Sequence, residues 1–377
     1  MTAASATRTT RPALPLSGWA LDLLVLLDAA HPGILRFAHQ ASPLRRQAIF
    51  LALAHLHRAA PEDLVARLAP HTEFCASDDP LQAISIALTT MRVRDIVRAL
   101  HPGVQGLVGA LGRLRPDPMH PLKYRALVGF LADADQRRAK VLRQIRISET
   151  ALTVLRIVDP ALLFPDLMRQ LRTSKDAEGF VAAVDLIRRI VPGVTNAALV
   201  ASLRALPPKS RLDAWAQRWV AKAKFPLTPP IQDDAQWRVL RSGKAMGDAA
   251  GRFQNCLRDK VGEVALGRTV YIEWVASDPR AMIEIAVLAG PGGTSQFVLE
   301  HVYGHRNGSV DSSVIPAICR KLQGAGILLP AKFGHARPYD RAAPLLNVWD
   351  FGFRGLPEED IGAIDAYLDE VMREEAA

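Results

Sequence analysis

Three short runs rich in β-branched and aromatic residues constrain the fold of this chain most. They are Thr269–Val275, Ala281–Leu288 and Gln296–Tyr303. The breaks between them contain turn-forming residues, Ser277-Asp278-Pro279 in one and Gly290-Pro291-Gly292-Gly293 in the other. Short extended runs joined by such turns are typical of consecutive strands. The pattern predicts a three-stranded antiparallel β-meander.

Side-chain alternation predicts which residues of this meander share a face. In the second run, Glu284 falls on the less apolar face. In the third run, the residues expected on one face are Phe297, Leu299, His301 and Tyr303. His301 should therefore lie beside aromatic side chains. A buried Glu284 would be satisfied by backbone groups or by an ion pair with Arg252 or Arg268.

Several polar residues in and around the meander follow a distinctive order. Asn255-Cys256-Leu257 comes first, Gly267-Arg268 precedes the first run, Glu284 lies in the second, and Gly304-His305-Arg306-Asn307 closes the third. Over about residues 237–325, this order resembles the PcfJ-like domain found in proteins of bacterial mobile and conjugative elements. The resemblance implies a type of domain and a mobile-element setting, but it implies no reaction.

Three positions depart from the family pattern. Lys260 stands near the position of a family aromatic residue, His301 replaces a Gln, and Tyr303 replaces an Arg. The residues at or next to the matching positions are our candidates for ligand binding: Asn255, Arg268, Glu284, Tyr303 and Gly304.

Cys256 is the candidate nucleophile of this region. At the start of a helix its thiol pKa could be lowered, with His301 or His305 as base and Asn307 orienting it, as in a cysteine hydrolase. The alternative is that Cys256 is a small core residue, which is the commoner role of a free Cys beside a Leu. We expect Cys319 to be buried. The three cysteines contain no C-x-x-C pair, so we expect no zinc site, no disulfide framework and no cofactor.

The chain before the meander is predicted to be helical. Apolar residues recur at helical spacing in Leu44–His57, Pro80–Met91, Pro121–Leu131, Leu142–Leu155, Glu178–Ile190 and Leu212–Ala223. Pro or Gly residues separate these segments, and no motif repeats at a constant period. This pattern predicts a helical bundle or an irregular α-solenoid. Two further helices are expected after the meander, over Ser312–Gly324 and Glu358–Glu374.

The Pro-rich stretch at residues 225–236 is the predicted domain boundary. We expect a disordered tail at residues 1–16, a helical domain at 17–224 and a PcfJ-like α+β domain at 237–377. The charge also divides near this stretch. Residues 1–230 contain 31 Lys and Arg against 18 Asp and Glu, whereas 231–377 contain 16 against 20. The basic excess therefore lies entirely in the helical part.

The basic residues of the helical part form two groups. The first is Arg92, Arg94 and Arg98, and the second is Arg137, Arg138, Lys140, Arg143 and Arg146 on one predicted helix. Basic clusters attract phosphate backbones without reading sequence, and the alternative is an ordinary Arg-rich surface.

We therefore expect a two-domain α+β protein of the cytoplasm. Its function is expected to be that of a binding or structural module that contacts nucleic acid or a nucleoprotein complex, with a protein partner as the other candidate. A cysteine-dependent hydrolase or transferase is the alternative function. No apolar run approaches the ~20 residues that cross a bilayer, so no membrane partner is expected.

Overall fold

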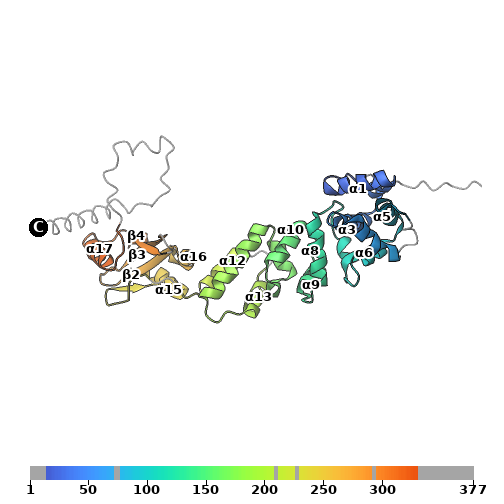
Figure 1. The fold of residues 1–377 in the computed structure, drawn as a ribbon. Coiled ribbons are helices and arrows are strands. Elements are labelled where there is room, and N and C mark those ends of the chain that lie inside the picture. The colour runs from blue at the N-terminus through green and yellow to red at the C-terminus, as the bar shows by residue number, and fades with distance from the viewer. Residues whose placement is uncertain (1–13, 72–76, 208–210, 226–228, 291–293, 330–377) are drawn as a thin grey trace, which may run out of the picture. The chain divides into compact units, whose positions relative to one another are not determined.

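The chain folds into two compact units, shown in Figure 1. The computed structural model describes residues 14–71, 77–207, 211–225, 229–290 and 294–329. One unit extends to Val181 and the other begins at Ala182, and we call them the N-terminal and C-terminal units. The N-terminal unit is helical and the C-terminal unit contains an antiparallel sheet, so the predicted α+β class is confirmed.

The helices of the N-terminal unit are short and follow one another closely. They are α1 (Trp19–Ala30), α2 (Ile34–Gln40), α3 (Pro43–Leu56), α4 (Pro61–Leu68), η1 (Ala69–His71), α5 (Pro80–Thr90), α6 (Val93–Leu100), α7 (Leu107–Leu111), α8 (Pro121–Ala132), α9 (Arg137–Leu142), α10 (Glu149–Ile157), η2 (Pro160–Leu162) and α11 (Pro165–Gln170). The last helix, α12 (Ser174–Ile190), crosses into the C-terminal unit. Proline in the first turn starts α3, α4, α5, α8 and α11, where its missing N–H has no intrahelical acceptor to lose.

One predicted helix is wrong. The segment Leu142–Leu155 is divided, because α9 ends at Leu142 and α10 begins at Glu149. The hydroxyl of Ser148 accepts a hydrogen bond from the Ala151 amide at 3.1 Å, which caps α10 and fixes its start. Arg143 and Arg146 therefore lie in the connection between two helices and not on one helix with Arg137.

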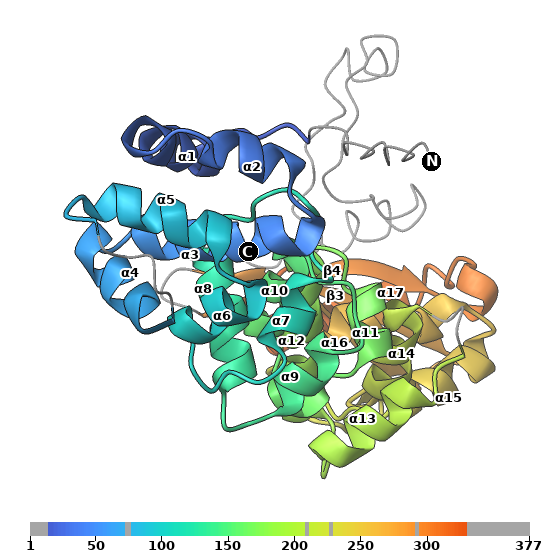
Figure 2. The same cartoon turned by 90° about the vertical axis from the view of Figure 1, so that its right-hand side faces the viewer.

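Helix α3 is the centre of the N-terminal unit, and it carries two buried polar side chains. Arg46 is fully buried, and its guanidinium donates to the carbonyls of Leu14, Pro15, Ala38 and Pro116 at 3.0–3.2 Å. Gln47 donates to the carbonyls of Arg115 and Asp117 and accepts from the Tyr124 hydroxyl at 2.6 Å. These bonds satisfy loop carbonyls that would otherwise be buried without a donor. Figure 2 shows α1 and α2 lying over α3 and α5.

The C-terminal unit contains a four-stranded sheet and the helices around it. The helices are α13 (Asn196–Arg204), α14 (Leu212–Val220), α15 (Gly243–Phe253), η3 (Cys256–Arg258), α16 (Val261–Ala265), η5 (His305–Asn307) and α17 (Ile315–Gly324). The strands are β1 (Trp237–Val239), β2 (Thr269–Trp274), β3 (Ala281–Ala289) and β4 (Ser295–Tyr303), all antiparallel in the order β1-β2-β3-β4. The predicted meander is confirmed, and β1 adds one strand beside β2.

Helices cover both faces of the sheet. Ile315, Ile318 and Leu322 of α17 pack into one core with Ile272, Ile283 and other apolar residues of the strands. The opposite face carries Tyr271, Glu273 and Glu284, and there α16 contacts β2. Figure 1 shows α17 on one side of the strands and α15 and α16 on the other.

A β-bulge corrects the predicted faces of β4. Glu284 pairs with His301, but the next residue, Ile285, pairs with Leu299, so Glu300 has no partner on β3. The extra residue reverses the alternation on one side of the bulge. Leu299 therefore lies in the α17 core, whereas His301 shares the face of Glu284. The expectation that Leu299 and His301 share a face is wrong.

The predicted domain boundary is at residues 225–236, whereas the two compact units meet in the chain after Val181, within α12. Backbone hydrogen bonds join the two sides of the Pro-rich stretch, from Phe225 N to Arg241 O and from Gly243 N to Ala223 O. Residues 226–228, the expected disordered tail up to residue 13 and the expected helix Glu358–Glu374 lie outside the described residues.

Candidate functional site

A buried carboxylate links three strands on the polar face of the sheet. Glu284 lies in the middle of β3, directly opposite Tyr271 of β2 and His301 of β4. The Tyr271 hydroxyl donates to Glu284 Oε1 at 2.5 Å, and the Tyr303 hydroxyl donates to Oε2 at 3.3 Å. Glu284 is 9% exposed. We call these three residues the Tyr-Glu-Tyr cluster.

Both tyrosines of the cluster keep their protons at neutral pH. Burial raises the pKa of Tyr271, and the neighbouring Tyr303 and Glu284 raise it further. Burial also raises the pKa of Tyr303, with Glu284 again adding to the effect. A phenolate beside a carboxylate is unfavourable in such surroundings, so both hydroxyls remain hydrogen-bond donors.

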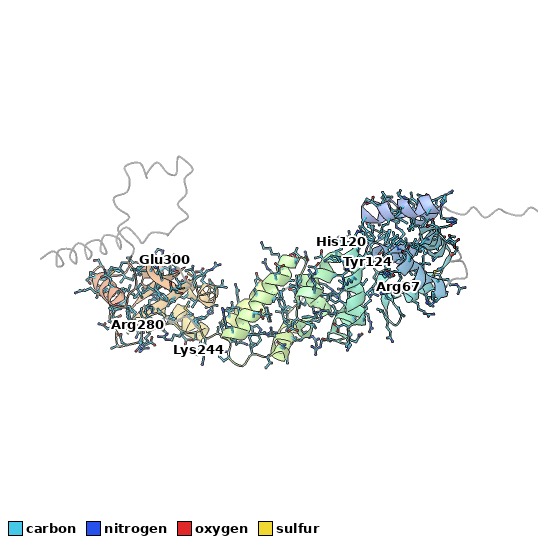
Figure 3. The ribbon with its side chains drawn as sticks, in the orientation of Figure 1. Arg67, His120, Tyr124, Lys244, Arg280 and Glu300 are labelled. Carbon is cyan, nitrogen blue, oxygen red and sulfur yellow. The ribbon has the colours of Figure 1, made fainter. Side chains whose placement is uncertain are left out.

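Three charged residues lie at the edge of the cluster. Lys260 Nζ is 3.2 Å from Glu263 Oε1. Burial alone would lower the pKa of Lys260, but this hydrogen bond and the nearby Glu263 and Glu284 carboxylates raise it. The pKa of Glu300, the bulge residue labelled in Figure 3, is raised by burial and by Glu284. The site therefore combines a fixed ammonium group with several carboxylates.

A second buried carboxylate, which the sequence did not reveal, lies on the same face. Glu273 of β2 is 1% exposed and binds Arg252 at 2.5 Å and Arg280 at 3.0 Å (Arg280 is labelled in Figure 3). Burial alone would raise the pKa of Glu273, but the two arginine hydrogen bonds hold it below its usual value. Arg252 thus pairs with Glu273 and not with Glu284. In the sequence, this carboxylate could have been predicted only from the alternation of β2, which places Glu273 on the same face as Tyr271.

Cys256 is exposed, so the alternative that it is a core residue is wrong. It begins η3, where Asn255 Oδ1 accepts a hydrogen bond from Leu257 N at 3.2 Å. Cys256 makes a minor contribution to the raised pKa of Lys260, after Glu263 and Glu284, and to that of Tyr303, after burial and Glu284. Cys319 is buried as predicted, and burial raises the pKa of its thiol to about 12.

The other predicted catalytic residues are dispersed around this site. His301 is partly buried on the face of Glu284, whereas His305 and Asn307 are exposed in η5. Within the described part of the chain, no hydrogen bond joins Cys256 to either histidine. The structure brings Cys256 near Tyr303 and Lys260 instead, and a catalytic role for these residues stays a prediction.

Two of the candidate ligand-binding residues have clear backbone roles. Gly304 is buried, and a Cβ there would lie 3.2 Å from the carbonyl oxygen of Ser309, which is tighter than most side chains tolerate. Its amide donates to Gly308 O at 2.8 Å and closes the loop that contains η5. The amide of Arg268 donates to Glu263 O at 3.0 Å, and its side chain is exposed.

The basic residues of the N-terminal unit fall into two classes. Arg138 is part of the fold, because it donates to Leu155 O at 2.8 Å, lies 3.7 Å from Asp133 and stacks on Phe130. Arg137 is paired with Asp135 at 3.7 Å. The remaining candidates are exposed and have no ion pair among the described residues: Arg92, Arg94, Arg98, Lys140, Arg143 and Arg146.

A surface hollow of about 400 Å³ adjoins the second group. We call it the basic hollow, and its polar lining includes Arg146, Ser148, Thr150, Arg169 and Arg172. Arg169 is paired with Asp166, whereas Arg172 is exposed and has no acidic partner in the described ranges. The sequence prediction missed Arg169, which lies in the last turn of α11, and Arg172, which follows the end of that helix.

Comparison of the chain with protein-family models, with curated proteins and with solved structures found no match. Among the described residues, no helix is both long and apolar enough to cross a bilayer, and no three His, Cys, Asp or Glu side chains converge to hold a metal ion.

Proposed function

We propose that this protein binds nucleic acid through the N-terminal unit, without reading its sequence. The observation that carries the proposal is the group of exposed arginines at the basic hollow. Arg146 and Arg172 line this hollow together with the hydroxyl-bearing Ser148 and Thr150. Neither arginine has an acidic partner among the described residues, and neither does the exposed Arg143, which precedes the hollow in the chain.

An arginine without an ion pair is suited to bind phosphate, because its guanidinium N–H groups are not already bound to a carboxylate. A guanidinium binds phosphate oxygens through two parallel N–H donors. Each phosphate that such a group neutralises releases condensed counterions, which contributes affinity that falls as salt rises. These arginines would contact phosphates and not base edges. Such contacts position the nucleic acid without specifying its sequence.

The two basic groups are connected through α7. Arg143 Nε is 3.9 Å from the position that a Cβ would take at Gly106, in the loop between α6 and α7. Arg113, which follows α7, donates to Leu142 O at 2.9 Å. Figure 2 shows α7 close to both α6 and α9. Arg98 lies in the last turn of α6, and we infer that it extends the surface that begins at Arg143.

Binding of labelled single- and double-stranded oligonucleotides, measured by fluorescence anisotropy at low salt, tests the proposal. We expect Arg146→Glu to weaken binding by about tenfold, since it replaces an attraction with a repulsion. Arg36→Glu is the matched control, because Arg36 is an exposed arginine of the same unit that does not line the hollow. Equal losses in the two variants would show that only the net charge matters.

The PcfJ-like resemblance at residues 237–325 supports a setting among mobile-element proteins, where a nucleoprotein complex is a natural partner. The chain's three cysteines include no closely spaced pair, and this supports a reducing cytoplasm as its location. The C-terminal unit would then serve as a binding or structural module.

A second candidate function is cysteine-dependent hydrolysis or group transfer at Cys256. The observation that favours it is the exposed thiol near Lys260 and Tyr303. A neighbouring ammonium group stabilises a thiolate, which is the nucleophilic form of Cys. The rate at which Cys256 reacts with a thiol reagent tests this candidate.

A further inference from the structure

A second hollow in the N-terminal unit brings together two histidines and two arginines. Its volume is about 350 Å³, which lies within the range of small-ligand sites. His55 comes from α3, Arg58 from the turn after it, His101 from the end of α6, and Arg125 from α8. We call it the His-Arg hollow. The remaining lining residues are Leu51, Ala54, Ala59, Pro121, Tyr124 and Val128, so none of the described residues that line it is acidic.

The fold leaves three polar side chains of this hollow without partners among the described residues. His55 Nε2 is shielded from solvent and has no hydrogen-bond partner among the described residues. Arg58 and Arg125 are exposed and have no ion pair in the described ranges. The Tyr124 hydroxyl is already bound to Gln47. A buried polar atom without a partner is unfavourable for folding, and His55 Nε2 occurs here beside two exposed guanidinium groups that have no ion pair.

We propose that the His-Arg hollow binds a tetrahedral oxyanion, a phosphate group in particular. Two guanidinium groups and two imidazoles offer more N–H donors than the two oxygens of a carboxylate can accept, whereas a phosphate group presents three or four oxygens. The apolar wall formed by Leu51, Ala54 and Val128 excludes competing water from one side. The shared ligand chemistry is the phosphate group, carried either by a small molecule or by a nucleic-acid backbone.

The lowered pKa values of the two imidazoles predict that the hollow takes up protons when it binds an anion. Burial lowers the pKa of His101 to about 4, with His55 and Arg67 adding to the effect. Burial and Arg67 also lower the pKa of His55, whereas Asp63 opposes them. Figure 3 labels Arg67 and Tyr124, which come from α4 and α8. Both imidazoles are thus neutral near pH 7. A bound oxyanion raises their pKa, so binding takes up protons and strengthens as pH falls from 8 toward 5.

Sulfate is the first probe, because its charge is constant between pH 5 and 8. The signals of His55 and His101 Hε1–Cε1 in NMR spectra of the full chain should shift on addition of sulfate and not of chloride at equal ionic strength. At ten times Kd, sulfate should raise Tm by about 3–5 °C. Affinity should fall by about tenfold in Arg125→Gln and stay unchanged in Arg36→Gln. Unmoved histidine signals and no shift of Tm would overturn the proposal.

Two further variants and a competitor refine the test. His55→Leu removes the unsatisfied nitrogen, so it should leave Tm unchanged or raise it while abolishing the sulfate effect. A sulfate effect that survives in both His55→Leu and Arg125→Gln would overturn the site. A single-stranded oligonucleotide then distinguishes the sources of phosphate. If it displaces sulfate from His101, the hollow holds a backbone phosphate, and if it does not, the hollow holds a separate small phosphate compound.

Discussion

Tyr271 and Glu284, thirteen residues apart in sequence, are joined across β2 and β3 by a 2.5 Å hydrogen bond from the phenol to the carboxylate. Tyr303 completes the arrangement from β4 at 3.3 Å. Because one carboxylate binds donors on both neighbouring strands, the cluster fixes the register of the sheet at the point where the bulge changes it.

The first prediction concerns this cluster. Tyr271→Phe leaves Glu284 Oε1 buried without its donor, so the free energy of unfolding should fall by about 1–3 kcal/mol. Tyr303→Phe, which removes the longer bond at a partly buried position, should cost less. Urea unfolding followed by circular dichroism measures both. No cost for Tyr271→Phe would show that the cluster contributes little to the sheet, and equal costs would show that the shorter hydrogen bond is not the stronger one.

The pH dependence of stability should report Glu273. Its pKa is lower in the folded protein than its usual value of 4.5. Its contribution is therefore complete above pH ~4.5 and is lost as pH falls through the folded pKa. Glu273→Gln should reduce the free energy of unfolding by about 1–3 kcal/mol at pH 7, and the difference from wild type should shrink below pH ~4.5. Chemical denaturation between pH 3 and 7 measures this, and a difference that does not vary with pH would contradict the account.

Close packing of α15 against the end of the preceding helical segment predicts a large effect at one glycine. A Cβ at Gly243 would lie 2.3 Å from the carbonyl oxygen of Ala221, so the backbone must shift to admit Gly243→Ala. We expect Tm to fall by several degrees in this variant, since such strain costs about 1–3 kcal/mol. Gly247→Ala in the same helix is the control. Nothing lies within 4 Å of its Cβ position, so the better helix former should be neutral or stabilising. A Gly243→Ala variant as stable as this control would mean that the contact is not tight.

The sequence predicts the sheet better than the site. Alternation and turn residues locate β2, β3 and β4 within one or two residues. The strand β1 is missed because a run of three residues, Trp237–Val239, carries too little periodic signal. The bulge at Glu300 is missed for a different reason. It depends on how β4 pairs with β3, and single-strand alternation contains no information about pairing.

The helical part shows the same limit. The periodicity of Leu142–Leu155 continues across a break that is set by one capping residue, Ser148. The split of the arginines into paired and unpaired groups is also hidden from the sequence. Arg138 and Arg143 are both arginines of the same basic stretch, yet Arg138 is held by contacts with Leu155, Asp133 and Phe130. Such roles depend on contacts between residues that are distant in sequence.

Thiol labelling tests the alternative function. Iodoacetamide at neutral pH should modify exposed Cys256 about tenfold faster or more than buried Cys319, which should react only on unfolding. Cys75 lies outside the described residues. If Lys260 stabilises the Cys256 thiolate, Lys260→Met should slow the reaction while His301→Ala leaves it unchanged. A slowed reaction in His301→Ala instead would favour the predicted Cys-His pair, and protection of Cys256 would remove the catalytic candidate.

The central claim is that phosphate contacts at the basic hollow hold nucleic acid, and the salt dependence of binding tests it most directly. The slope of log Kobs against log salt concentration counts these contacts, at about 0.9 per neutralised phosphate of duplex DNA. The account predicts that the slope of Arg143→Gln/Arg146→Gln/Arg172→Gln is smaller in magnitude than that of wild type by about 2–3. It also predicts that Arg36→Gln leaves the slope unchanged. A triple variant with the wild-type slope, or a wild-type protein that does not bind at low salt, would contradict it.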